Sequence, residues 1–121
     1  MTTNAAPGAD LDPEDAKIIT LARSARARSG SETGAAVRDE TGRTYAAVDV
    51  GFTSFALTAL QLAVAMAASS GATSLEAAAV VSAQGSLSGR QLAAAWDLRA
   101  GQVLLAAPDG SLTARYAPEG G

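Results

Sequence analysis

The chain has 121 residues, of which 48% are hydrophobic and 4% aromatic, a length and composition typical of one globular domain. Its formal net charge of −3 argues against a nucleic-acid binder, which needs a basic face. The sequence contains no cysteine and no histidine, which excludes disulfides, thiol nucleophiles, imidazole bases and conventional transition-metal sites. It has neither a secretory signal nor an apolar run suited to a bilayer, so we expect a soluble, cytoplasmic protein without a cofactor.

The N-terminal residues 1–11 are small and polar, and they include a proline and a glycine. This composition predicts a disordered arm, followed by one domain over 12–117 and a flexible tail over 118–121. The domain is expected to open with a helix. Asp12 suits the cap of that helix, and Pro13 suits its first position.

A β-hairpin and a second helix are expected next. Two short apolar runs, 34–37 and 45–50, flank the turn sequence Asp39-Glu40-Thr41-Gly42, which is a hairpin signal. Ser54 is expected to cap a second helix that ends near Ser69. Apolar residues occur on every side of this helix, which predicts that it is buried all round or covered by another subunit.

The second half of the chain alternates strands and helices. A buried strand over 77–81 is followed by a helix capped by Ser88, and strands are expected over 103–106 and 112–116. The predicted order is α-β-β-α-β-α-β-β, and the alternation implies parallel strands. The expected fold class is α/β, with three layers, a mixed five-stranded sheet and about three helices.

Several short sequences resemble the small homotetrameric cytidine deaminases, and they occur in the same order along the chain. They are TGAAV at 33–37, DETGR at 39–43, AVDV at 47–50, LT at 57–58 and RQ at 90–91. The resemblance implies the three-layer cytidine-deaminase fold. An active member would also hold zinc with three Cys or His ligands and would use a Glu to shuttle protons.

The resemblance places the zinc-binding and catalytic positions on residues that cannot perform those roles. The first ligand position falls on Leu60 and the proton-shuttling position on Leu62, while Ser86 and Gly89 stand where two thiolates belong. We therefore expect no metal, no catalytic residue and no deaminase activity. Both leucines are expected to be inaccessible to solvent and to fill the former metal cavity.

Two functions remain open for such a chain. One is a homo-dimeric or homotetrameric interaction or regulatory module, because the family's tetramers pack the second helix across their centre. The alternative is a protein that binds a nucleoside, an anion or another small polar ligand in the vestigial pocket, where two helix starts offer N–H groups. No nucleic acid or membrane partner is expected. The polar residues expected around that pocket are Asp49, Thr58, Gln61, Ser86 and Ser88.

Overall fold

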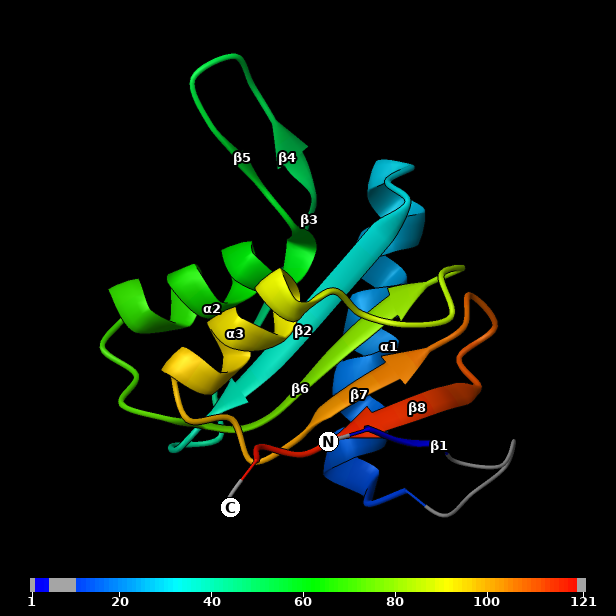
Figure 1. Ribbon diagram of the computed structural model, residues 1–121, viewed down its shortest axis with the longest axis vertical. Helices are drawn as coiled ribbons and strands as arrows, with labels where there is room; N and C mark the ends of the chain where they lie inside the picture. Colours follow the sequence, from blue (N-terminus) through cyan, green and yellow to red (C-terminus); the bar gives the residue numbers. More distant parts are fainter. Residues whose placement is uncertain (1, 5–10, 120–121) are drawn as a thin grey trace.

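The computed structural model describes residues 2–4 and 11–119, and these form three layers around one β-sheet (Figure 1). Helix α1 (Pro13–Ser29) covers one face of the sheet, and helices α2 (Ala59–Ser69) and α3 (Gly89–Asp97) cover the other. The strands are β1 (Thr2–Asn4), β2 (Thr33–Asp39), β3 (Thr44–Val48), β4 (Val50–Gly51), β5 (Ala56–Leu57), β6 (Leu75–Ser82), β7 (Val103–Ala106) and β8 (Leu112–Tyr116).

The main sheet has the order β1-β8-β7-β6-β2-β3, and β6 and β7 are its one parallel pair among the described strands. The five strands from β8 to β3, the three helices and their order along the chain confirm the predicted α/β fold. Strand β1 adds a sixth, antiparallel strand beside β8 and comes from the segment that was expected to be a disordered arm. The rest of that arm, residues 1 and 5–10, and tail residues 120–121 lie outside the described residues.

The second helix begins at Ala59, and the prediction that Ser54 caps it is wrong. Thr58 and Gln61 form a reciprocal capping box at the true start, which satisfies two backbone N–H groups at once. Ser54 instead lies at the turn of a small hairpin between β4 and β5, closed by a 2.8 Å hydrogen bond from Phe52 N–H to the Phe55 carbonyl. This hairpin projects from the body of the molecule (Figure 1).

Two apolar cores lie on the two faces of the sheet. Ile18, Ile19 and Ala22 of α1 pack on one face, and α2 and α3 pack on the other. Small side chains let the layers approach closely: a Cβ at Gly34 would collide with the carbonyl oxygen of Ala22. No helix among the described residues is long and apolar enough to span a membrane.

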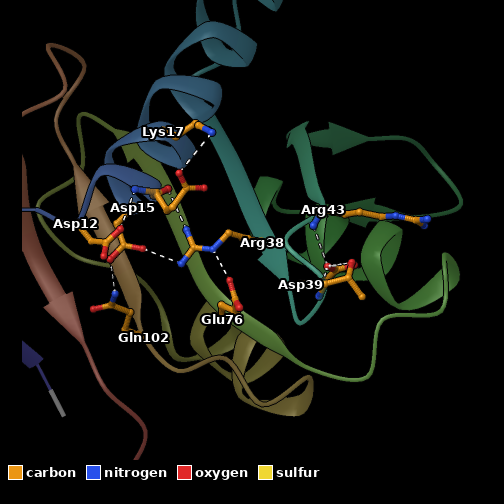
Figure 2. A network of polar contacts seen from close by, with 10 residues as sticks. Asp12, Asp15, Lys17, Arg38, Asp39, Arg43, Glu76 and Gln102 are labelled. Atoms are coloured by element: carbon orange, nitrogen blue, oxygen red, sulfur yellow. Dashed lines mark hydrogen bonds and ion pairs between the residues drawn. The ribbon is translucent and has the colours of Figure 1, made fainter.

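Helix α1 is tied to the sheet by a network of charged groups around Arg38 on β2 (Figure 2). The guanidinium contacts Asp15 at 3.0 Å and Glu76 at 2.6 Å. Asp15 also accepts a 2.8 Å hydrogen bond from Gln102, the residue before β7. Because Asp15 is only 6% exposed, its charge needs these partners, and the network fixes α1 against β2 and β6.

The β2–β3 turn is organised by the buried carboxylate of Asp39. One carboxylate oxygen accepts hydrogen bonds from the Thr41 N–H and hydroxyl and from the Arg43 N–H, and the other accepts from the Tyr45 hydroxyl at 3.1 Å. Burial by itself raises the pKa of Asp39. The hydrogen bonds from Thr41, Arg43 and Tyr45 outweigh burial, so the pKa lies below its usual value.

Acid should destabilise the protein through Asp39. A folded-state pKa that is lowered gives stabilisation that is present above the unfolded pKa and is lost as the pH falls through the folded one. The melting temperature of the parent should therefore fall as the pH is lowered through and below the usual titration range of an aspartate, and that of Asp39→Asn should fall less steeply. Asp97→Asn is the matched control, because the Asp97 side chain accepts no hydrogen bond within the described residues. Equal acid slopes for Asp39→Asn and the parent would contradict this role.

Candidate functional site

A pocket of about 320 Å³ lies where β3 ends and helices α2 and α3 begin. It gathers three of the five residues predicted to surround a ligand: Asp49, Thr58 and Gln61. The other two, Ser86 and Ser88, are exposed and do not line it. The full lining is Thr33, Asp49, Ala56, Leu57, Thr58, Gln61, Arg90 and Gln91.

The start of α2 is closed by side chains of the chain itself. Asp49 accepts a 2.8 Å hydrogen bond from the Ala59 N–H, so the end of β3 is joined to the first helical residue. Gln61 N–H donates to the Thr58 hydroxyl, and the Thr58 N–H donates to the Gln61 side-chain oxygen. These N–H groups, expected to be available to a ligand, already have acceptors.

The start of α3 carries the same kind of capping box. Ser88 caps this helix as predicted, and it forms a second capping box with Gln91. The preceding N–H, of Leu87, donates to the Tyr116 hydroxyl at 3.0 Å. Both helix starts therefore carry a capping box, and the N–H groups of Gly89 and Arg90 at α3 make no hydrogen bond within the described residues.

The positions that the resemblance assigns to the metal and its proton shuttle do not form a donor set. Leu60 is completely buried against the sheet, as predicted, but Leu62 is half-buried, so the prediction for Leu62 is wrong. Residues two apart on a helix do not share a face, so both side chains cannot point at the sheet. Ser86 and Gly89 are exposed.

Two leucines, one serine and one glycine offer no ligand set that fits zinc. Within the described part of the chain, no group of three or more His, Cys, Asp or Glu residues is placed to hold a metal ion. The chemistry left in the pocket is polar but mild: one carboxylate, one guanidinium, two amides and two hydroxyls.

The sequence interpretation did not include Arg90, Gln91 and Thr33 among the pocket residues. Arg90 and Gln91 had a signal, because they form one of the short sequences that resemble the deaminases. The side chain of Arg90 makes no hydrogen bond or ion pair within the described residues, so it is the pocket's uncommitted cation.

Comparisons with known proteins agree on one family. A sequence model of the family described as cytidine deaminase-like matches residues 11–110. The crystal structure of cytidine deaminase from Burkholderia pseudomallei superposes with a TM-score of 0.71 at 20% identity, covering 83% of this chain and 90% of that one. Cytidine deaminase from Mycobacterium tuberculosis gives 0.63 at 23% identity, with 84% and 89% covered. The enzyme from Mycobacterium leprae gives 0.62 at 21% identity, with 83% and 92% covered. No curated protein matches the chain in a sequence search.

The difference in burial between Leu60 and Leu62 is testable. Leu60→Ala should lower the free energy of unfolding by about 2–5 kcal/mol, because it removes a fully buried side chain and leaves a cavity. Leu62→Ala should cost clearly less, because part of that side chain already contacts solvent. Urea denaturation followed by circular dichroism measures both. Equal losses, or a larger loss for Leu62→Ala, would show that the orientation of α2 is different.

Proposed function

Because this chain belongs to the cytidine deaminase-like family, we propose that it is a catalytically inactive member that works as a homo-oligomeric interaction module in the cytoplasm. The main support for an interaction module is a long uncharged segment that lies on the surface. No charged residue lies between Asp49 and Glu76, yet this segment forms the projecting β4–β5 hairpin and the surface helix α2.

Inactivity follows from the chemistry that deamination requires. Zinc lowers the pKa of a bound water so that hydroxide exists at neutral pH, and a Glu moves the protons. At the corresponding positions this chain has Leu60, Leu62, Ser86 and Gly89. A serine nucleophile is no substitute, because Ser86 is exposed and makes no hydrogen bond to a base within the described residues.

The uncharged segment exposes large apolar side chains. Phe52 is 64% exposed, Phe55 is 54% exposed and Met66 is 38% exposed. The two phenylalanine rings, the only ones in the chain, lie 5.4 Å apart at the hairpin turn. Two exposed phenylalanine rings in contact with each other support binding of another molecule at the hairpin.

A second copy of the chain is the partner that this surface suits best. An isologous contact sets the same patch against itself, which for a charged patch means like-charge repulsion. The patch here carries no charge, while the molecule as a whole carries −3. A hollow of about 410 Å³ on α2 is lined by Tyr45, Leu62, Ala65, Met66, Ser69 and Ser70, none of which is charged.

Small-ligand binding is a second candidate function. It is favoured by the pocket at the start of α2, where Arg90 and Asp49 place opposite charges on one lining. The expected ligand is small and polar, with groups that can pair with a guanidinium and a carboxylate. This candidate leaves the exposed phenylalanines unexplained, and for that reason the interaction module is the better proposal.

The purified protein should contain no stoichiometric zinc and should not convert cytidine to uridine. Elemental analysis after expression in zinc-supplemented medium and an ultraviolet absorbance assay measure the two properties. An active zinc cytidine deaminase assayed in parallel confirms that both measurements work. Zinc near one equivalent together with turnover would overturn the proposal of inactivity.

The parent protein should scatter light as a dimer or tetramer at micromolar concentration. Phe55→Glu should shift the mass toward the monomer, because a carboxylate in an apolar contact must lose its hydration without a partner. Thr20→Glu places the same charge on the exposed face of α1 and should leave the mass unchanged. A monomeric parent across the concentration range, with a thermal shift on adding nucleosides, would instead favour the small-ligand function.

A further inference from the structure

The main sheet ends at β3 on one side and at the three-residue strand β1 on the other. No described strand pairs with the outer side of β3, which is the longer of the two edge strands. The sequence of β3, TYAAV, contains no charged residue and no proline, and its pairing with β2 runs without a bulge. Natural proteins use charged residues, prolines and bulges to keep exposed edge strands from pairing, so an edge strand without them is suited to pairing with another strand.

The backbone groups that face the open side can be identified. Asp39 N–H donates to the Arg43 carbonyl, so Arg43 directs its backbone groups toward β2. Successive residues of an antiparallel strand direct their N–H and C=O groups to alternate sides. The regular register therefore turns Tyr45 and Ala47 toward β2. Thr44, Ala46 and Val48 direct their N–H and C=O groups outward.

There is room beside this edge for another strand. A hollow of about 380 Å³ lies between the C-terminal end of α1 and β3, and it is lined by Ala25, Arg28, Ser29, Ala46, Ala47 and Val48. On the other face, the hollow on α2 includes Tyr45 of the same strand. The edge is therefore open on both sides of the sheet.

We propose that β3 pairs antiparallel with β3 of a second copy, about a two-fold axis that passes through Ala46. This inference rests on the proposed homo-oligomer and names one of its contacts. The axis at Ala46 sets Ala46 opposite itself and Thr44 opposite Val48 of the second copy. It is the register in which every outward N–H and C=O group of β3 finds a partner.

Charge complementarity selects the same register. Arg43 and Asp49 are equally far from Ala46 along the chain, so Arg43 of one copy lies opposite Asp49 of the other copy. The guanidinium of Arg43 makes no hydrogen bond or ion pair within the described residues, and Figure 2 shows its side chain extending away from Asp39. Asp49 is exposed and uses one carboxylate oxygen for the Ala59 N–H. Opposed residues whose backbone groups point away from each other bring their side chains closest, so the two ions meet.

The pairing also brings together surfaces that each copy leaves uncovered. Helix α2 packs on β2 and β3, so the two-fold axis sets one α2 beside the other on the same face of the joined sheet. The uncharged outer side of α2, with Leu62 and Met66, then faces its own counterpart. A single two-fold axis therefore gives hydrogen-bond partners to the outer side of β3, pairs the opposite charges and covers the apolar face of α2.

Charge reversal tests the register. Arg43→Asp and Asp49→Arg each set two pairs of like charges across the axis, so each should raise the dissociation constant of the β3 contact by roughly tenfold or more. An equimolar mixture of the two variants restores two opposite-charge pairs and should associate as tightly as the parent. Arg99→Asp changes the charge equally at an exposed position between α3 and β7 and should have no effect. Sedimentation velocity over a dilution series measures all four.

The outcomes separate this inference from the proposed function. Association of the mixture but of neither variant alone supports pairing at β3. If Phe55→Glu dissociates the oligomer while both charge reversals leave it intact, the oligomer stands and the β3 register is wrong. A parent that stays monomeric overturns both, and leaves the edge for an extended segment of a different protein. Ala46→Pro, which removes an outward N–H, is the variant to use if Asp49→Arg does not fold, and unchanged association of Ala46→Pro would overturn the pairing.

Discussion

Asp49 at the end of β3 accepts a hydrogen bond from the first N–H of α2, and Thr58 and Gln61 close the same turn. In a zinc deaminase with this fold, ligands from the two helix starts hold the metal, and the metal joins them. In this chain α2 and α3 carry separate caps, and the side chain of Leu60 is fully buried. Local caps and apolar packing thus hold α2 in position.

The two faces of the sheet are held by different forces. Helix α1 is fixed through Arg38, Asp15 and Glu76, a network with strong directional preference. Helix α2 has no charged residue, and small apolar side chains hold it on the opposite face. On the face covered by α1, no large apolar side chain of the described residues is exposed, whereas the α2 face leaves Leu62 and Met66 partly exposed. This asymmetry is the physical reason for assigning partner binding to the α2 side.

The sequence predicted those elements whose ends are marked by glycine, proline or turn residues. Strands β7 and β8 have the predicted bounds, because Gly101 and the turn at Pro108–Gly110 isolate them. The start of α2 was placed too early, since Ser54 and Thr58 are both suitable caps and only the reciprocal partner Gln61 distinguishes them. That error carried Phe55 into a helix and hid the hairpin. The pocket was predicted in part: Asp49, Thr58 and Gln61 meet through the β3–α2 connection, whereas the loop bearing Ser86 turns outward, which no local pattern indicated.

The projecting hairpin and the β3 edge are different surfaces, and this limits the possible assemblies. In the proposed assembly each surface meets the same surface of another copy, and an isologous contact closes on itself. One such contact gives a dimer, and two with perpendicular axes give a closed tetramer. Head-to-tail use of either surface would build an open filament, and an unguarded edge without a closed partner would expose the chain to aggregation. Closure through β3 thus serves two purposes: it sets the symmetry of the assembly and it pairs the longer of the two edge strands of the described main sheet.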